Sequence, residues 1–179
     1  MELYLCEHIT KKEDAYTLLA YAVRQHWGLS QLPPIARTEG GKPYFPTHPQ
    51  YHFNLSHSGC FALCVLDDQP VGADIEVIRP HHPNLAQRIC SREELDWLNA
   101  QSDLTIALCQ LWTAKEALVK YHGIGLTVPL RSIRVPLPPV SKQDHLHFHS
   151  MVTRTRCVCI CGHSAAAPLV IVPPEEISV

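Results

Sequence analysis

The spacing of hydrophobic residues predicts two long amphipathic helices. The first covers residues 15–26 and is closed by Gly28. The second begins after Ser102 or Asp103 and ends at Gly123. In both, apolar side chains recur three and four residues apart, which is the period of a helix with one buried face. These two helices are expected to form the framework of the fold.

Shorter elements are expected between and after these helices. Residues 84–89 predict a short helix, and Ser91, with Glu94 three residues on, predicts a capping box that starts another. The prolines and glycines of residues 28–49 predict a loop with short extended pieces, and a Pro173-Pro174 tail is expected to end the chain. Runs rich in apolar and β-branched residues predict strands at residues 60–66, 71–78, 132–137, 145–152 and 156–161.

The order of these elements predicts two similar lobes. A turn at residues 67–70 separates the first two strands, which are therefore expected to pair as a hairpin. Each half then offers a helix and strands, and 179 residues suit one unit of two lobes better than two independent domains. The expected boundary divides the chain into lobes at residues 1–78 and 79–179.

The amino-acid composition limits the binding partners and the cellular compartment that we expect for this protein. Hydrophobic residues make up 46% and charged residues 18%, and the net charge of −2 lacks the basic bias typical of nucleic-acid binding. No apolar window is long enough to span a membrane and the first residues do not resemble a secretion signal, so a cytoplasmic protein is expected. In that compartment the eight cysteines are expected to be reduced, buried thiols.

Two carboxylates stand on one face of the predicted strand 71–78. Asp74 and Glu76 are two residues apart, hence about 7 Å apart on the same side. On their own such a pair indicates an ordinary solvated strand face. If the pair is recessed, the mutual repulsion is large, and a divalent cation between the acids would remove it.

The second long helix adds a third carboxylate. Plotted at 100° per residue, Glu116 lies on the flank of the apolar stripe, whereas Lys115 falls close to its middle. A lysine there either snorkels or is buried with a partner. Trp112, Glu116 and Lys120 follow one another at four-residue spacing, which presents an aromatic, an acid and an ammonium along one edge.

Two further segments carry polar side chains. Residues 54–58 hold serine hydroxyls and one imidazole just before a predicted strand; they suit either a turn or a phosphate-binding segment. His145, His147 and His149 alternate with apolar residues, which favours a polar strand face over a zinc site.

Taken together these motifs resemble the 4′-phosphopantetheinyl transferases of the surfactin-synthetase-activating type. The central motifs are Asn54-Leu55-Ser56-His57-Ser58, Gly72-x-Asp74-Ile75-Glu76 and Trp112-Thr113-x-Lys115-Glu116-Ala117-x-x-Lys120. The resemblance also includes Lys12-Glu13-Asp14-Ala15, Gly41-Lys42-Pro43-x-x-Pro46 and Gly123-x-Gly125-Leu126. It therefore extends over nearly the whole chain.

The resemblance implies a fold and a reaction. The implied fold is mixed α+β, a pseudo-dimer in which each lobe packs a helix on a small, largely antiparallel sheet, and a monomer is expected. The implied reaction moves the 4′-phosphopantetheine arm of coenzyme A to a serine of an apo acyl or peptidyl carrier protein, with magnesium as cofactor.

The resemblance also implies roles for individual residues. Magnesium is expected at Asp74, Glu76 and Glu116, with Glu116 also acting as the base, directly or through a water. The residues expected to touch coenzyme A are Lys120 at the pyrophosphate, Ser56 and His57 at the phosphates, and Lys42 and Thr17 at the nucleotide end. Lys115 is expected to be a structural or site-lining cation.

One departure from the family pattern leaves alternatives open. Larger members carry a basic helical segment before the Lys-Glu-Asp-Ala motif, and only residues 7–11 stand in its place here. An active transferase is favoured because Asp74, Glu76, Glu116 and Lys120 are all present in this chain. The alternatives are a non-catalytic module that binds coenzyme A or a carrier protein, and a magnesium-dependent nucleotide hydrolase.

Overall fold

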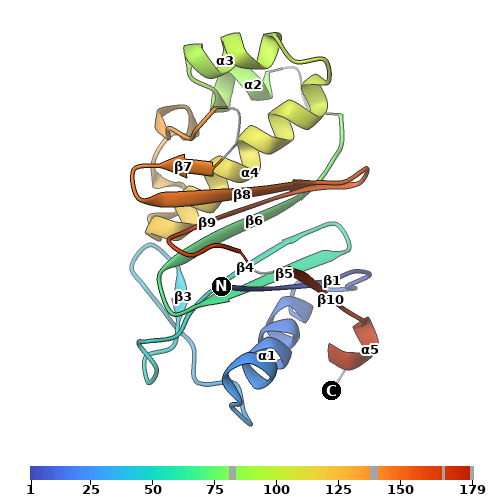
Figure 1. The fold of residues 1–179 in the computed structure, drawn as a ribbon, viewed down its shortest axis with the longest axis vertical. Helices are drawn as coiled ribbons and strands as arrows, with labels where there is room; N and C mark the ends of the chain where they lie inside the picture. Colours follow the sequence, from blue (N-terminus) through green and yellow to red (C-terminus); the bar gives the residue numbers. More distant parts are fainter. Residues whose placement is uncertain (81–83, 138–140, 167, 178–179) are drawn as a thin grey trace.

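Two lobes are stacked along the long axis of the molecule (Figure 1). The structure is a computed structural model that describes residues 1–80, 84–137, 141–166 and 168–177. In the described part of the chain, no helix is both long enough and apolar enough to cross a membrane.

The first lobe packs a helix on a four-stranded sheet. Its elements are β1 (Glu2–Cys6), α1 (Asp14–Trp27), β2 (Ala36–Arg37), β3 (Pro43–Tyr44), β4 (His52–Ser58), β5 (Phe61–Asp67), β10 (Leu169–Val172) and α5 (Pro174–Ile177). The sheet has the order β10-β1-β5-β4, and β2 pairs with β3 in a separate small ribbon. Helix α1 ends at Gly28, whose φ of 67° is the left-handed conformation that glycine adopts without strain.

The second lobe repeats this plan. Its elements are β6 (Val71–Val77), α2 (Leu85–Ile89), α3 (Arg92–Asn99), α4 (Leu104–His122), β7 (Ser141–Gln143), β8 (Leu146–Val152) and β9 (Arg156–Gly162), with short 3-10 turns at Gly125–Thr127 and Leu130–Ser132. The sheet order is β6-β9-β8-β7. Asp103 caps α4 by accepting bonds from two backbone N–H groups, and Gly123 ends the helix, as the sequence predicts.

The two lobes share a topology, which confirms the predicted mixed α+β pseudo-dimer. In each lobe a strand, a helix and two strands follow in order, β1-α1-β4-β5 and β6-α4-β8-β9. In each sheet the first of these strands lies antiparallel to the last. The predicted helices at residues 15–26, 84–89 and 91–98 and the strands at 145–152 and 156–161 are present with small shifts at their ends.

The predicted hairpin and lobe boundary are wrong. β5 pairs with β1 and β4, whereas β6 pairs with β9 in the other sheet. The apolar face of β6 packs on the apolar face of the first sheet in a shared core, so the two strands stack between sheets instead of pairing at their edges. The boundary therefore lies in the turn at residues 68–70, before β6, and β10 returns to the first lobe beside β1.

Residues 132–137 do not form the predicted strand. Leu130–Ser132 is a 3-10 turn and no regular element follows it up to residue 137. The backbone carbonyls of Leu130 and Ile133 instead accept hydrogen bonds from the Lys115 ammonium. The short strand β7, the edge strand β10 and helix α5 were not predicted, the last two because they lie in or near a segment interpreted as a tail.

Gly72 allows α4 to lie directly against β6. A Cβ atom at this position would overlap the backbone of Ala117 and Tyr121. Gly72→Ala is therefore expected to destabilise the protein by about 3 kcal/mol, at the upper end of the usual cost of overpacking. Urea unfolding checks this. Gly162→Ala in the neighbouring strand is the control, because there the new methyl would chiefly meet the flexible end of Met1. Equal losses of stability in the two variants would contradict the close packing of α4 on β6.

Candidate active site

The face of β6 that carries Gly72 also carries the two acids. Because side chains alternate along a strand, Asp74 and Glu76 project toward α4 on the same side as Gly72. Asp74 is only 3% exposed and Glu76 is half-buried. A solvated strand face is thus the wrong interpretation, and the acids are recessed between the sheet and the helix.

Asp74 lies at the centre of a polar cluster that joins the lobes. Its Oδ1 accepts a hydrogen bond from Ser56 Oγ of β4 at 2.7 Å. The Lys120 ammonium of α4 lies 2.7 Å from the same oxygen and donates to Ser56 Oγ at 2.8 Å. Burial raises the pKa of Asp74, while Lys120 and Ser56 act against that rise. One serine, one aspartate and one lysine from three elements therefore form the centre of the site.

Glu116 faces the same cluster from α4. Burial is the main cause that raises the pKa of Glu116, and the charges of Asp74 and Glu76 raise it further against the opposing charge of Lys120. Its Oε1 is buried and has no hydrogen-bond partner among the described residues, and the same holds for Asp74 Oδ2. A water, a ligand or an ion can satisfy buried oxygens of this kind.

Glu76 is held from two sides. Ser58 Oγ of β4 donates to its Oε2 at 2.6 Å, and Trp112 of α4 also hydrogen-bonds to it. Burial raises the pKa of Glu76, the hydrogen bond from Ser58 lowers it, and the charge of Asp74 raises it again. Glu76 also lines an apolar cavity of about 250 Å³ beside Trp112 and Cys109.

A second cavity, of about 240 Å³, lies beside Glu116 and Lys120. Its lining comes from both lobes and consists of Gly40, Gly41, Lys42, Pro43, Asn54, Leu55, Glu116, Val119, Lys120, Gly123 and Gly125. Two of the residues expected to bind coenzyme A, Lys42 and Lys120, thus meet Glu116 around one space. We call it the junction cavity.

Lys42 has a structural task in this cavity. Its ammonium donates to the carbonyls of Val71 and Tyr121, at 3.0 and 2.8 Å, and so joins the first lobe to the last turn of α4. Burial lowers the pKa of Lys42 to about 8. Contact with the nucleotide end stays a prediction for this residue, which lines the cavity but is bonded to the backbone.

His57 and Thr17 lie apart from the acids. The segment 54–58 belongs to strand β4 itself, not to a turn before a strand, so Ser56 and His57 point to opposite faces and the His57 ring is exposed. Thr17 donates to the carbonyl of Asp14 and lines a different cavity, of about 330 Å³, beside α1. Their contacts with coenzyme A stay predictions.

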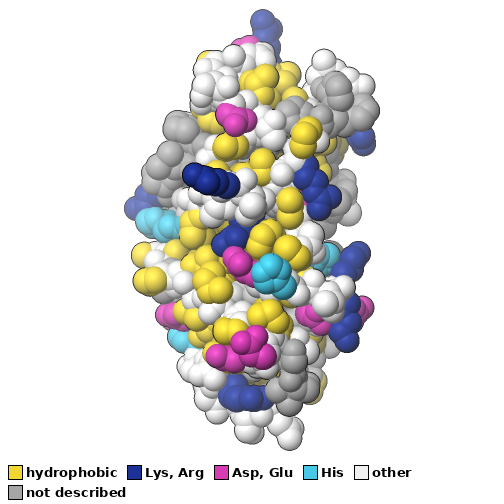
Figure 2. Space-filling view, turned by 90° about the vertical axis from the view of Figure 1, so that its right-hand side faces the viewer, with side chains coloured by type: hydrophobic (Ala, Val, Ile, Leu, Met, Phe, Trp, Pro, Cys, Tyr) yellow, Lys and Arg dark blue, Asp and Glu magenta, His cyan; other side chains and the backbone are white. Residues whose placement is uncertain are grey.

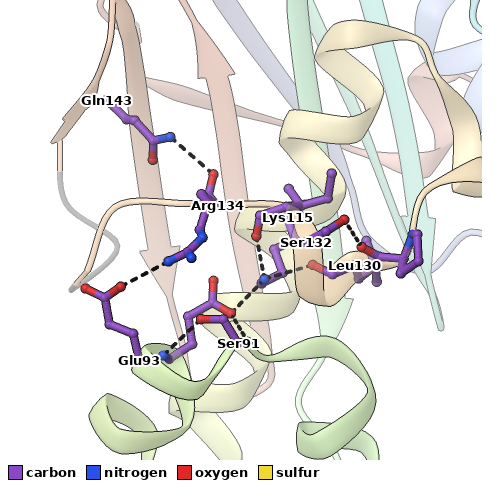
Figure 3. A network of polar contacts seen from close by, with 10 residues as sticks. Ser91, Glu93, Lys115, Leu130, Ser132, Arg134 and Gln143 are labelled. Atoms are coloured by element: carbon purple, nitrogen blue, oxygen red, sulfur yellow. Dashed lines mark hydrogen bonds and ion pairs between the residues drawn. The ribbon is translucent and has the colours of Figure 1, made fainter.

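Lys115 is buried, and its polar partners belong to α3 and to the 130–133 segment (Figure 3). It is 0% exposed, and its ammonium lies 2.8 Å from Glu94 Oε2 at the start of α3. It also donates to the carbonyls of Leu130 and Ile133. The buried position predicted for Lys115 is confirmed, and its part is structural: it holds α4 against α3 and the 130–133 segment.

The three acids have the ligand chemistry that a divalent cation prefers. Asp74, Glu76 and Glu116 supply hard oxygen ligands, and two of their oxygens are orphaned inside the protein. Among residues outside the undescribed gaps, no three His, Cys, Asp or Glu side chains already stand at metal-ligand spacing. The three acids influence one another's pKa without standing at ligand spacing, and the Lys120 ammonium is the cation that contacts Asp74.

The raised carboxyl pKa values predict a specific dependence of stability on pH. The folded state holds these protons more tightly than the unfolded chain, so their stabilising contribution is complete below the ordinary pKa values of 3.8 and 4.5. That contribution is lost as the pH rises through the raised values. In a buffer that contains a metal chelator, the melting temperature of Asp74→Asn should fall less with rising pH than the melting temperature of the wild type.

A control isolates the buried position. Asp96→Asn replaces an exposed aspartate of α3 and should leave the pH profile of the melting temperature unchanged. Identical profiles for wild type and Asp74→Asn would contradict a raised pKa at Asp74.

One face of the molecule shows how the surface charges are distributed. The face shown in Figure 2 mixes acidic, basic and hydrophobic side chains along its length, and carries no extended basic field.

Three residues that bond to β6 at the site were given no individual role in the sequence analysis. Ser58 and Trp112 bond to Glu76, and Asn54 Oδ1 accepts a bond from the backbone N–H of Ala73. The two-residue spacing of Asn54, Ser56 and Ser58 was a usable signal, because in a strand it puts all three side chains on one face.

Comparison with known proteins identifies the family to which the chain belongs. The model of the 4′-phosphopantetheinyl transferase superfamily matches residues 70–164, which is more than half of the chain and includes the two acids of β6 and all of α4. The chain belongs to the 4′-phosphopantetheinyl transferase superfamily.

Individual members of the superfamily are similar over a larger part of the chain. The 4′-phosphopantetheinyl transferase Sfp of Bacillus subtilis (strain 168) is 36% identical over 141 residues, covering 74% of this chain and 63% of the relative. The 4′-phosphopantetheinyl transferase psf-1 of Bacillus pumilus is 37% identical over 123 residues, covering 67% of this chain and 53% of the relative.

A relative from another genus matches a shorter segment more closely. The 4′-phosphopantetheinyl transferase AcpT of Salmonella typhimurium is 42% identical over 115 residues, covering 62% of this chain and 59% of the relative. The chain thus spans less than two thirds of the length of these transferases.

Proposed function

We propose that this protein transfers the 4′-phosphopantetheine arm of coenzyme A to a serine hydroxyl of an apo carrier protein, releasing adenosine 3′,5′-bisphosphate. The observation that carries the proposal is the junction cavity, in which Glu116 and Lys120 from α4 face Lys42 and Gly41 from the first lobe. A site of this kind can bind an anionic nucleotide and act on its phosphates, and the superfamily of the chain supports this reaction.

The residues divide the chemical work. Lys120 carries the positive charge that a pyrophosphate needs, and it shares Ser56 with Asp74. Glu116, with a raised pKa and an orphaned oxygen at the cavity, is suited to take the proton from the attacking serine, directly or through a water. Positioning of the two substrates around these groups supplies the rest of the rate enhancement.

We further propose magnesium as the cofactor, held by Asp74, Glu76 and Glu116. Their raised pKa values and orphaned oxygens support this proposal. When bound, a magnesium ion neutralises charge on the pyrophosphate and makes the bisphosphate a better leaving group.

We also propose that the protein is a cytoplasmic monomer. Because both lobes belong to one chain, the site needs no second copy, which supports a monomer. All eight cysteines are free thiols, which suits the reducing cytoplasm.

A mass assay tests the proposed reaction. The full chain is incubated with coenzyme A, magnesium chloride and separate apo carriers for fatty acids, peptides and polyketides. At least one carrier is expected to gain the mass of one phosphopantetheine arm. Absence of any gain would contradict transfer, and coenzyme A binding without gain would favour a non-catalytic binding module.

A further inference from the structure

The outer edge of β6 is paired by side chains instead of by another strand. β6 has β9 on one side, and on the other side its backbone N–H groups meet β4 of the first lobe. Three alternate side chains of β4 act as acceptors for three alternate N–H groups of β6. The pairs are Ala73 N to Asn54 Oδ1 at 2.9 Å, Ile75 N to Ser56 Oγ at 3.3 Å and Val77 N to Ser58 Oγ at 3.1 Å. We call this arrangement the β4–β6 ladder.

Each serine of the ladder also orients one acid. Ser56 donates its proton to Asp74 at 2.7 Å, and Ser58 donates to Glu76 at 2.6 Å. A hydroxyl has one proton, so Ser58, which accepts from the Val77 N–H, has its own donor directed at Glu76 alone. The ladder thereby couples the contact between the lobes to the direction of each carboxylate.

Ser58 differs from Ser56 in its contacts. Ser56 also contacts Lys120, whereas the hydrogen bonds of Ser58 are to Glu76 and Val77, and Ser58 is not among the residues that line the junction cavity. Without Ser58, Glu76 would keep the bond to Trp112 and could turn into the apolar cavity that it lines. The carboxylate would then point away from Asp74.

We propose that Ser58 is a positioning residue, whose hydroxyl holds the Glu76 carboxylate toward Asp74 and Glu116 and so sets the affinity of the acid cluster for magnesium. The proposal rests on the proposed function for its effect on turnover. Its effects on cation binding and on the Val77 amide are independent of that function.

The test compares Ser58→Ala with Ser58→Thr in the full chain. Loss of a partner that orients a metal ligand typically costs 10- to 100-fold in affinity or activity. Ser58→Ala is therefore expected to raise the magnesium concentration for half-maximal transfer by about 10-fold or more and to lower kcat, with the KM for coenzyme A within about twofold. Ser58→Thr retains the hydroxyl and a side chain suited to a strand, so it should restore both values.

Two readouts do not require turnover. Hydrogen exchange followed by NMR should show faster exchange of the Val77 amide in Ser58→Ala, and titration of magnesium chloride alone should show weaker binding. Ser150→Ala is the matched control, because Ser150 also lies on a strand of the second lobe and its buried hydroxyl has no hydrogen-bond partner in the part of the chain that the structure describes. It should leave all these measurements unchanged.

The outcomes separate this proposal from the proposed function. Unchanged magnesium binding in Ser58→Ala, or equal losses in Ser58→Thr, would overturn the positioning role. A rise confined to the KM for coenzyme A would also overturn it, since Ser58 would then contact the substrate. Failure of the wild type to modify any carrier would count against the transferase alone, while weaker magnesium binding and a faster-exchanging Val77 amide in Ser58→Ala would still support positioning.

Discussion

Glu116→Gln is expected to lower kcat for phosphopantetheine transfer by about 10³-fold, within the range that a positioned general base contributes. Gln fills nearly the same volume, but it accepts no proton and carries no charge for a cation. Glu116 faces Asp74 and lines the junction cavity, so the change acts at the site and leaves the core packing intact. Single-turnover mass spectrometry of an apo carrier measures the rate.

The control for this variant is another Glu→Gln change. Glu93 is exposed and pairs with Arg134 on the surface of the second lobe, so Glu93→Gln should transfer at the wild-type rate. The pH dependence provides a second check. Because burial and two neighbouring acids raise the pKa of Glu116, the wild-type kcat/KM should rise with pH later than for an ordinary glutamate, and this rise should disappear in Glu116→Gln. A variant rate close to wild type would remove Glu116 from the chemistry.

Lys115→Met is expected to destabilise the fold by about 3–5 kcal/mol, the usual result of removing one partner of a buried ion pair. The change leaves the Glu94 carboxylate buried at 3% side-chain exposure and frees the carbonyls of Leu130 and Ile133. Glu94 would keep its bond from the Ser91 backbone, which does not neutralise its charge. Urea unfolding of the purified full chain measures the loss.

Two comparisons make this prediction specific to burial. In the double variant with Glu94→Leu the uncompensated charge is gone, so part of the lost stability should return. The exposed Arg134–Glu93 pair, which lies in the same view, is the matched control (Figure 3). Arg134→Met should change the free energy of unfolding by less than about 1 kcal/mol, as for other surface pairs. Equal losses for Lys115→Met and Arg134→Met would contradict the buried network.

Much of the second lobe was predictable from local patterns. The caps at Ser91, Asp103 and Gly123 define the helices α3 and α4, and helical periodicity correctly buried Lys115 and placed Glu116 at the flank. These features depend on neighbours within one or two turns of the same helix, so the sequence alone specifies them.

The pairing of β6 was not predictable in the same way. β5 and β6 are both apolar and separated by a short turn, a pattern that suits a hairpin as well as two stacked sheets. The outcome depends on β9, more than seventy residues further along the chain, which supplies the actual partner of β6. The same long-range choice exposes the edge of β6 to Asn54, Ser56 and Ser58, so the β4–β6 ladder also escapes a local prediction.

The positions of His57 and Thr17 depend on more than the motifs in which they stand. Both belong to segments that resemble the family, yet period-two alternation turns His57 away from Ser56, and α1 places Thr17 at a separate cavity. A motif specifies which residues are near in sequence, whereas the register of β4 and the packing of α1 decide which side chains lie opposite one another.

The most direct test of the central claim follows both products of one reaction. The full chain is mixed with coenzyme A, magnesium and an apo carrier, and the modified carrier and free adenosine 3′,5′-bisphosphate are quantified together over time. The account predicts equal amounts of the two products, with neither formed by Glu116→Gln on the same timescale. Bisphosphate release without a gain in carrier mass would instead identify a hydrolase and contradict the account.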